Sequence, residues 1–352
     1  MTTLTLPADL AFPVIDGHND LPWECRVARG SSVEGVDDTA LTLHTDLPKL
    51  RAGGVVGQFW SVFVETTEPD PVRATLQQID LVHRMVARYP ESLALARTAS
   101  DVVRAVEQGR VASLLGAEGG HSIGDDLAVL RTFARLGVRY MTLTHNDDTP
   151  WADSATGSRP HGGLTDRGRE VVAEMERLGV LVDLSHVSPD TMRDALDVAT
   201  APVVFSHSST VGVADHPRNV PDDVLRRLPD VGGVVMVTFV PQFVSRRYAD
   251  WLAADVARAE GEPGEAAPPV TVADVADHVE HARDLAGAAH VGLGGDYDGT
   301  PTLPDDLRDV SRYPVLADEL RSRGWGPADL RALAGGNVLR VLAATDERFA
   351  AN

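Results

Sequence analysis

The chain has 352 residues, of which 43% are hydrophobic and 24% charged, a composition typical of a globular protein, and no apolar run approaches the roughly 20 residues that span a bilayer. The 32 basic and 52 acidic residues give a net charge of −20, which disfavours nucleic acid and anionic membrane surfaces as partners. The one cysteine, Cys25, excludes an internal disulfide and a multi-cysteine metal site, so histidines and carboxylates remain as metal ligands.

In chain order, residues 1–10 lack the basic stretch followed by a long apolar segment that is typical of a secretory signal, so we expect a cytoplasmic protein. The next feature is Lys49, the only lysine of the chain, beside Pro48 in a helix-like stretch. We interpret it as a solvated surface amine, although a Schiff base or a carbamylated metal bridge could come from no other residue.

Short runs rich in β-branched residues then alternate with stretches of helical spacing. The runs cover residues 12–20, 54–64, 110–119, 138–146, 180–187, 202–208, 232–240 and 290–298. Apolar residues recur at helical spacing over 166–178 and 188–199, and Ser188 followed by Pro189 is typical of a helix start. Apolar strands separated by helices indicate a parallel sheet buried on both faces, and eight such units predict an α/β fold of the (β/α)8 TIM-barrel type. An open doubly wound sheet is the alternative.

Residues 257–269 interrupt this alternation with a segment rich in proline, glycine and glutamate. Because helical spacing resumes at Ala273 and another strand follows, we interpret the segment as an insertion loop and not as a domain boundary. No period of about 20 to 50 residues repeats, which gives solenoids and propellers no support. We therefore expect residues 1–352 to form a single catalytic barrel domain.

Polar residues gather at the carboxyl ends of the predicted strands. They are His18, Asp20, Glu118, His145, His186, His207 and Asp296. In a parallel barrel these ends open on one face, where the active sites of this fold lie. Taken singly, such a histidine is more often a packed or loop residue than a ligand. Several from independent strands are hard to explain by packing, because unpaired buried charges are costly.

A cluster of imidazoles and carboxylates without a thiolate suits Zn²⁺, with Mn, Co or Fe as substitutes. His18 and Asp20 are two residues apart, so on a strand their side chains would point the same way and reach one ion. With Glu118, His186 and His207 there are five good ligands, more than the three that a single catalytic zinc usually takes. Since a carboxylate such as Glu118 can bridge two ions about 3.5 to 4 Å apart, the sequence favours two Zn²⁺ ions per chain.

A series of short segments carries a family pattern in order over nearly the whole chain. They are VIDGHNDLPW at 14–23, GAEGGHSI at 116–123, RYMTLTHN at 139–146 with TPWAD at 149–153, LSHVS at 184–188, FSHSS at 205–209, RNVPDD at 218–223, GGDYDG at 294–299 and GGNVLR at 335–340. The series resembles that of the renal (membrane) dipeptidase family, zinc peptidases of the amidohydrolase-like barrel type. Exported members of that family carry a signal peptide, a lipid-anchor signal and disulfide cysteines, which this sequence does not show.

Carried over residue by residue, the resemblance implies that His18 and Asp20 hold the first zinc, that Glu118 bridges, and that His186 and His207 hold the second.

Three further residues match family positions that act on the substrate. His145 corresponds to the histidine that contacts the scissile carbonyl, Arg218 to the arginine that receives the substrate carboxylate, and Asp296 to the acid beside the bridging water. The remaining histidines, including His44 and His216, have no strand-end placement, so we expect them to have surface or supporting roles. For Trp23 the first expectation is core packing, with a place in the wall of the pocket as the alternative.

These residues suffice for a hydrolytic mechanism. Two Zn²⁺ ions with Asp20 and Glu118 keep a positive charge that favours a bridging hydroxide as nucleophile. Asp296 would move the proton to the leaving amine. One zinc and His145 would stabilise the carbonyl oxygen, and the guanidinium group of Arg218 would bind a carboxylate. We therefore predict a binuclear zinc dipeptidase, and the resemblance implies that L-Xaa-D-Xaa dipeptides are among its substrates.

Two alternatives remain open. One is a metal-dependent amidohydrolase that acts on another amide, a lactam or an ester, such as N-acyl amino acids. The other is a catalytically silent metal-binding homologue. The sequence leaves open the preferred side chains, the physiological metal and the formation of a homodimer.

Overall fold

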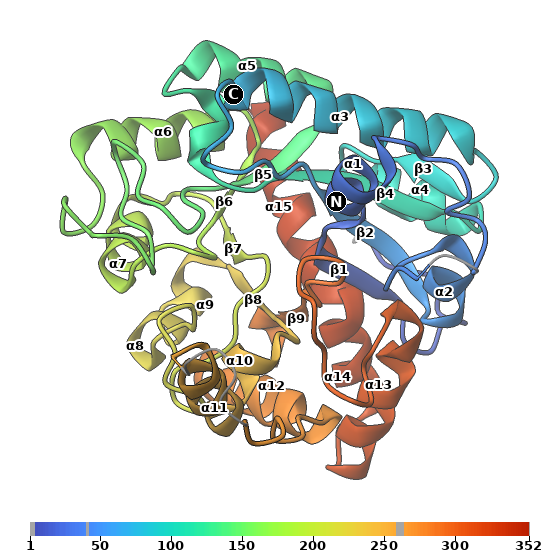
Figure 1. Ribbon diagram of the computed structural model, residues 1–352. Coiled ribbons are helices and arrows are strands. Elements are labelled where there is room, and N and C mark those ends of the chain that lie inside the picture. The colour runs from blue at the N-terminus through green and yellow to red at the C-terminus, as the bar shows by residue number, and fades with distance from the viewer. Residues whose placement is uncertain (1–3, 40–41, 258–263, 352) are drawn as a thin grey trace.

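The computed structural model describes residues 4–39, 42–257 and 264–351, and its central feature is a ring of parallel strands (Figure 1). The strands are β1 (Val14–Asn19), β2 (Val55–Ser61), β3 (Leu93–Leu95), β4 (Val111–Ala117), β5 (Val138–Thr142), β6 (Leu181–Asp183), β7 (Val203–Phe205), β8 (Val234–Val237) and β9 (Val291–Leu293). Neighbours follow the order β2-β1-β9-β8-β7-β6-β5-β4-β3, and a pairing of β2 with β4 closes the ring. The predicted (β/α)8 barrel is confirmed, with β3 as an added strand that pairs with β4.

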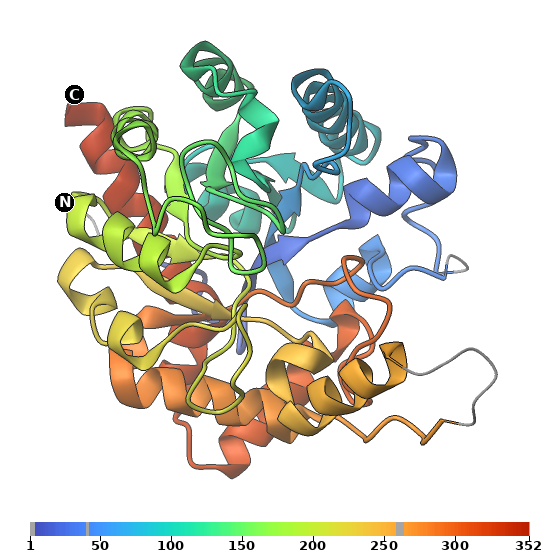
Figure 2. The same ribbon diagram turned by 60° about the vertical axis from the view of Figure 1, so that its left-hand side comes forward.

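Helices follow most of the strands and surround the ring (Figure 2). The α-helices are α1 (Leu21–Arg29), α2 (Leu47–Ala52), α3 (Pro71–Arg88), α4 (Ala99–Glu107), α5 (Leu127–Leu136), α6 (Asp166–Arg177), α7 (Pro189–Val198), α8 (Asp222–Leu225), α9 (Leu228–Val231), α10 (Pro241–Val244), α11 (Arg246–Val256), α12 (Val272–Ala286), α13 (Tyr313–Ser322), α14 (Pro327–Arg331) and α15 (Asn337–Ala351). Shorter helical turns are η1 (Gly120–Ile123), η2 (Ala288–His290), η3 (Val310–Arg312) and η4 (Ala332–Gly336).

Side-chain caps explain where the predicted helices begin. The side chain of Ser188 accepts a hydrogen bond from the backbone N–H of Thr191 at the start of α7, and Thr165 does the same for Gly168 in α6. These bonds satisfy N–H groups that have no partner within the helix. Both helices therefore lie within one residue of the predicted ranges.

The core continues from the inside of the barrel to one of its ends. Phe59, Tyr140 and Met236 from the strands belong to the same buried cluster as Val338 and Leu342 of α15. Helix α15 therefore packs across the end where the strands begin, which leaves the carboxyl ends as the open face. Among the described residues, no helix has the length and apolar character that crossing a bilayer requires.

The strands are shorter than the sequence pattern suggested. The runs predicted to end at 146, 187 and 298 stop at Thr142, Asp183 and Leu293, and loops follow. Of the predicted insertion loop, 258–263 lie outside the described residues and 264–269 form no helix or strand.

The backbone explains why the strands stop early. His186 and Asp296 have φ values of 66° and 60°, a left-handed conformation that an extended strand does not allow. Such a conformation is uncommon outside glycine and is concentrated at functional sites in proteins.

Candidate metal centre and substrate cavity

A cavity of about 480 Å³ opens where the strands end. Its lining includes acidic, imidazole and aromatic side chains from separate strand-end loops: Asp20, Trp23, Phe63, Glu65, Glu118, His145, Asn146, Thr156, His186, His216, Arg218, Val240, Gln242, Phe243, Asp296, Gly299, Thr300 and Pro301. The cavity therefore collects most of the residues that the sequence placed at strand ends.

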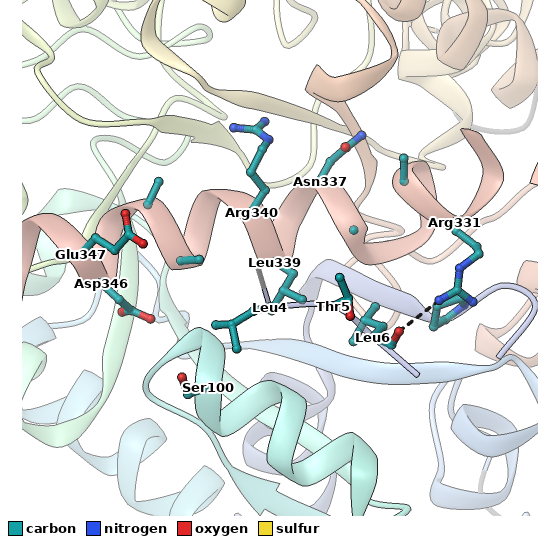
Figure 3. Close-up of a pocket in the computed structure, with 15 residues that line it drawn as sticks. Leu4, Thr5, Leu6, Ser100, Arg331, Asn337, Leu339, Arg340, Asp346 and Glu347 are labelled. Carbon is teal, nitrogen blue, oxygen red and sulfur yellow. Dashed lines mark hydrogen bonds between the residues drawn. The ribbon is translucent and has the colours of Figure 1, made fainter. Parts of the chain in front are cut away.

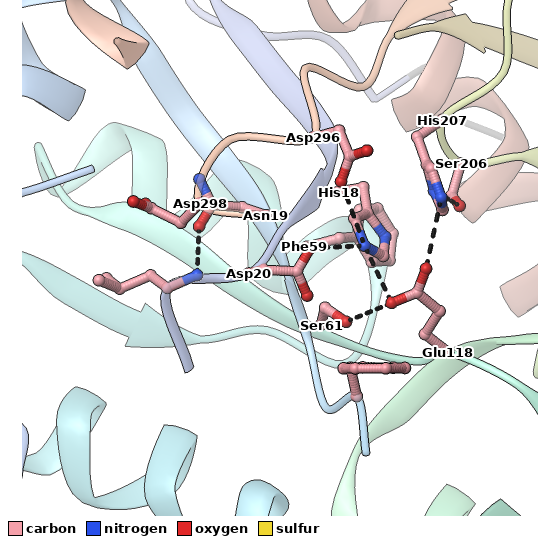
Figure 4. A network of polar contacts seen from close by, with 12 residues as sticks. His18, Asn19, Asp20, Phe59, Ser61, Glu118, Ser206, His207, Asp296 and Asp298 are labelled. Carbon is pink, nitrogen blue, oxygen red and sulfur yellow. Dashed lines mark hydrogen bonds and ion pairs between the residues drawn. The ribbon is translucent and has the colours of Figure 1, made fainter. Parts of the chain in front are cut away.

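Glu118 lies between two groups of ligand side chains (Figure 4). It follows β4 directly and is 4% exposed. Its Oε2 atom is 3.3 Å from Nε2 of His18, whereas its Oε1 atom is 3.1 Å from Nε2 of His186 and 3.4 Å from Nε2 of His207. Each carboxylate oxygen therefore faces a different half of the cluster.

The first half consists of His18 and Asp20, with Nε2 and Oδ2 separated by 3.2 Å. The predicted closeness is observed, but strand alternation does not produce it, because Asp20 lies beyond β1 as the N-cap of α1. The register of β1 also shifts between Asp16 and Asn19. A Cβ on Gly17 would lie 2.4 Å from the carbonyl oxygen of Ser206, so only glycine allows this close approach.

The second half consists of His186 and His207, whose Nε2 atoms are 2.9 Å apart. Burial lowers the pKa of both imidazoles well below the ordinary value, so both are neutral at pH 7. A neutral imidazole is the form that binds a metal ion. Two neutral rings that bring their nitrogens to one point beside a carboxylate make a strong cation-binding arrangement.

Most of these atoms are spaced like the ligand atoms of a tetrahedral zinc site. Bonds of about 2.0 to 2.1 Å place neighbouring ligand atoms about 3.3 Å apart. The contacts of His18 with Asp20 and Glu118, and of Glu118 with His186 and His207, measure 3.1 to 3.4 Å. Nε2 of His18 and Oδ1 of Asp20 have no hydrogen-bond partner in the described chain. The His186–His207 separation of 2.9 Å is shorter than this spacing. Three overlapping groups of side chains bring ligand atoms within 4.8 Å of one another: His18 with Glu118 and His207, Glu118 with His145 and His186, and His18 with Asp20 and Asp296. The donor types and their closeness therefore suit metal ions on both sides of Glu118.

The charges around His18 also favour a cation. Against the effect of burial, Tyr140, Glu118 and Asp20 raise the pKa of His18 well above its ordinary value. Burial also disfavours the charged form of Glu118, yet His18 and the hydrogen bonds of the other imidazoles hold the pKa of Glu118 well below its ordinary value. Positive charge at this point is therefore favourable, whether a proton or a metal ion supplies it.

Hydrogen bonds from behind orient two of the rings. Nδ1 of His18 is 2.8 Å from the hydroxyl of Tyr140, and Nδ1 of His207 is 2.8 Å from Oγ of Ser206. Ser206 in turn donates to Oδ2 of Asp183 at 2.6 Å. These contacts turn both Nε2 atoms toward Glu118, as second-sphere partners do in metal sites.

Two further predicted residues border this cluster. Oδ1 of Asp296 lies 4.0 Å from Nε2 of His18, and burial raises the pKa of Asp296 to about 7 against the opposing effect of His18. Nε2 of His145 lies 3.8 Å from Oε1 of Glu118, farther than the other imidazoles of that half, and burial lowers the pKa of His145. Both groups therefore lie next to the five predicted ligands, and both line the cavity. We call these five ligands the metal cluster: His18, Asp20, Glu118, His186 and His207.

Arg218 supplies a buried positive charge to the cavity. It is 3% exposed, and none of its three guanidinium nitrogens has a hydrogen-bond partner in the described chain. Its guanidinium carbon lies 5.2 Å from the ring centroid of Phe243, so the guanidinium group makes a cation–π contact with this ring. A buried arginine without a partner is costly unless an anion joins it, which indicates a carboxylate ligand.

The structure corrects the interpretation of several residues. His216 lines the cavity, where the sequence indicated a surface or supporting role. Trp23 also lines the cavity, which is the alternative to core packing that the sequence left open. Phe63, which the sequence analysis did not single out, packs against Trp23 at 4.9 Å and His145 at 4.6 Å between ring centroids. The phenylalanine lies just beyond β2 in an apolar run, so its pattern is that of a core residue.

A larger cavity, of about 970 Å³, lies at the opposite end of the barrel, beside α15 (Figure 3). None of the described residues that line it is a histidine. Arg331 donates to the carbonyls of Leu6, Pro7 and Leu10, and Asp346 pairs with Arg139 at 2.9 Å. Its charged groups are thus largely engaged by protein, so size alone does not make it the active site.

Comparisons with known proteins bear on the family and the fold of this chain. A family model described as membrane dipeptidase (peptidase family M19) matches residues 9–351. A Schizosaccharomyces pombe protein named as an uncharacterized dipeptidase is 44% identical over 96% of this chain and 81% of its own length. Dipeptidase verJ of Clonostachys rogersoniana is 42% identical over 98% of this chain and 86% of its own. A Rhodobacter sphaeroides metallopeptidase, crystallised with a phosphinate mimic of the dipeptide L-Ala-D-Ala, has a TM-score of 0.81 at 26% identity, covering 95% of this chain and 99% of that one.

Proposed function

This chain belongs to the membrane dipeptidase family and is a metallodipeptidase, and we propose that it works with two Zn²⁺ ions and accepts L-Xaa-D-Xaa dipeptides. The observation that carries the proposal is the position of Glu118, whose two oxygens face two separate ligand groups. His18 and Asp20 would hold one ion, and His186 and His207 the other. The L-Ala-D-Ala mimic on the Rhodobacter enzyme supports the stereochemical part.

Bound zinc would supply a water whose pKa is lowered to about 7 and a positive charge for the carbonyl oxygen. Asp296 would take the proton of the attacking water and give it to the leaving amine. Because burial raises the pKa of Asp296 to about 7, this carboxyl group exchanges a proton readily near neutral pH. One side chain can therefore serve as base and then as acid.

His145 would donate a hydrogen bond to the scissile carbonyl oxygen. Burial lowers the pKa of His145, so at pH 7 the ring is neutral and carries one N–H. Packing against Phe63 on one side and against His186, with ring centroids 4.4 Å apart, restrains its orientation. A restrained donor stabilises the negative charge that develops on the carbonyl oxygen during attack.

Arg218 would bind the carboxylate of the substrate. The guanidinium of Arg218 and the carboxyl group of Asp296 line the same cavity, so a short substrate can meet both. A free carboxylate lies one residue beyond the last peptide bond of any peptide, so this anchor would direct cleavage to the C-terminal peptide bond. Restriction to dipeptides would in addition require that the N-terminal side of the cavity accepts a single residue.

The proposal is tested with zinc-reconstituted enzyme on a library of L,L and L,D dipeptides, with amine release as the readout. Bound metal is counted in the same samples. We expect two zinc ions per chain and turnover of both dipeptide classes. Full activity with one ion per chain would overturn the binuclear proposal. Faster hydrolysis of N-acyl amino acids or esters than of any dipeptide would favour the broader amidohydrolase alternative, and a fully loaded protein without turnover would favour a silent homologue.

A further inference from the structure

A second cavity, of about 340 Å³, adjoins the catalytic one. Four residues line both cavities: Trp23, Gly299, Thr300 and Pro301. The lining of the second cavity adds Glu24, Thr42, Leu43, His44 and Asp298. We call this second cavity the side cavity. Arg218 and Phe243 do not line it, so it extends from the catalytic cavity away from the proposed carboxylate anchor.

The side cavity begins directly beside the metal cluster. A Cβ on Gly299 would lie 2.3 Å from Oδ2 of Asp20 and 2.5 Å from Oδ1 of Asp296, so this glycine packs against both carboxylates. Glu24 lies one helical turn after Asp20, and its N–H donates to the carbonyl of Asp20 at 3.0 Å. Residues four apart on a helix have Cβ atoms about 5 to 6 Å apart on the same face. A substrate side chain of ordinary length can therefore reach Glu24 from the metal cluster.

Two carboxyl groups, those of Glu24 and Asp298, line the side cavity. Glu24 is half-buried, and within the described chain its carboxylate has no hydrogen bond or ion pair. Asp298 is 7% exposed, with Oδ1 accepting from the N–H of His44 at 2.7 Å and Oδ2 lacking a partner in that same part of the chain. In Figure 4 the side chain of Asp298 lies beyond Asn19, away from His18. The side cavity therefore presents two incompletely engaged carboxyl groups. Burial raises the pKa of Asp298 to about 7, so its negative charge is only partly present at neutral pH.

Nearby basic side chains do not neutralise this charge. The ammonium of Lys49 is bound by Asp46 at 2.9 Å and by the carbonyl of Leu43 at 2.6 Å. Burial, together with Lys49, lowers the pKa of His44, which leaves that ring neutral at pH 7. A ligand that carries its own positive charge would complete the side cavity.

We infer that the side cavity binds the side chain of the N-terminal residue of the substrate and favours a lysine or arginine there, an inference that rests on the proposed dipeptidase function. With the substrate carboxylate at Arg218 and the scissile carbonyl at the metal cluster, the N-terminal residue lies against the wall that the two cavities share. The ring of Trp23, held edge-on against Phe63, forms that wall and packs against the aliphatic stem. Glu24 binds the charge at the end of the stem.

The test compares Lys-Ala with norleucine-Ala, which has a side chain of similar shape without the charge. The measured quantity is the ratio of the two kcat/KM values. We expect the wild type to favour Lys-Ala and Glu24→Gln to lower the ratio about five- to tenfold, as expected for a half-buried ion pair. Glu65→Gln is the matched control, because Glu65 is an exposed carboxylate that lines the catalytic cavity but not the side cavity.

Three results would overturn the inference. They are a wild-type ratio near one, a ratio that Glu24→Gln leaves at its wild-type value, and an equal fall in the ratio with Glu65→Gln. Glu24→Lys reverses the charge at this position. We expect this variant to prefer Glu-Ala over norleucine-Ala. If the kcat/KM ratios contradict the inference but the wild type hydrolyses norleucine-Ala, the dipeptidase function still holds. An absence of turnover on every dipeptide would overturn both proposals.

Discussion

Replacement of Arg218 by methionine should stabilise the protein and at the same time impair catalysis. Burial lowers the pKa of Arg218 from its ordinary value of 12.5 to about 10, partly offset by Asp296, Glu118 and Asp183. Because one pKa unit corresponds to about 1.4 kcal/mol, the buried charge costs about 3 kcal/mol of folding free energy. A lowered pKa disfavours the protonated side chain in the fold, so this cost is present at every pH below about 10.

Methionine keeps an unbranched apolar stem but is shorter than arginine, so the substitution removes the charge together with the guanidinium that packs on Phe243. An unfolding entropy of about 2.1 cal/mol/K per residue over 352 residues converts 3 kcal/mol into a rise in Tm of about 4 °C. The kcat/KM for dipeptides should fall about 100-fold, mainly through KM, because a buried charge-assisted pair contributes about 3 kcal/mol.

The stability assay uses metal-free protein in thermal and urea unfolding, so that metal binding does not contribute. Kinetics are measured on the zinc-loaded protein with the same dipeptide for every variant. Arg218→Lys distinguishes the effect of the charge from the effect of the hydrogen-bond geometry, because lysine keeps the positive charge but cannot form the bidentate hydrogen bond to a carboxylate. A methionine variant that is less stable than the wild type, or one whose KM stays within about threefold, would refute the reasoning.

Four further predictions concern the metal cluster. Asp296→Asn should retain both metal ions, measured by metal analysis, and lower kcat by about 10²- to 10⁴-fold. In the wild type, kcat/KM should fall as the pH is lowered, because burial raises the pKa of Asp296 above its ordinary value and only the deprotonated form is a base. Bound cations lower this pKa, so the acid limb of the zinc-loaded enzyme should lie below pH 7, and the asparagine variant should lack the limb. Glu118→Gln should lower the affinity for both ions together, and a titration in which a single ion is lost would argue against a bridge. Tyr140→Phe removes the 2.8 Å contact with Nδ1 of His18 and should weaken metal binding about 10- to 100-fold, whereas unchanged affinity would show that packing alone orients the ring.

Much of the fold and many of the site residues could be predicted from local pattern. The apolar run that contains β8 and the serine cap of α7 are visible within a few residues, because hydrophobic periodicity and capping depend on near neighbours in the chain. Glu118 and His207 were predicted as ligands from their place after an apolar run. His216 could not be found in this way, because its place in the cavity depends on the path of the loop after β7 and not on a strand pattern.

Sequence by itself determined which residue types stand at the ends of eight apolar runs, and hence the barrel and the class of its metal chemistry, since parallel strands bring those ends to one face. The tertiary structure alone decided that Glu118 presents one oxygen to each pair of ligands and that Asp20 reaches His18 from beyond its strand. It also decided that the side cavity opens behind Gly299. The physical reason is that distances between side chains from separate loops depend on how all the strands close together, and no local periodicity encodes them.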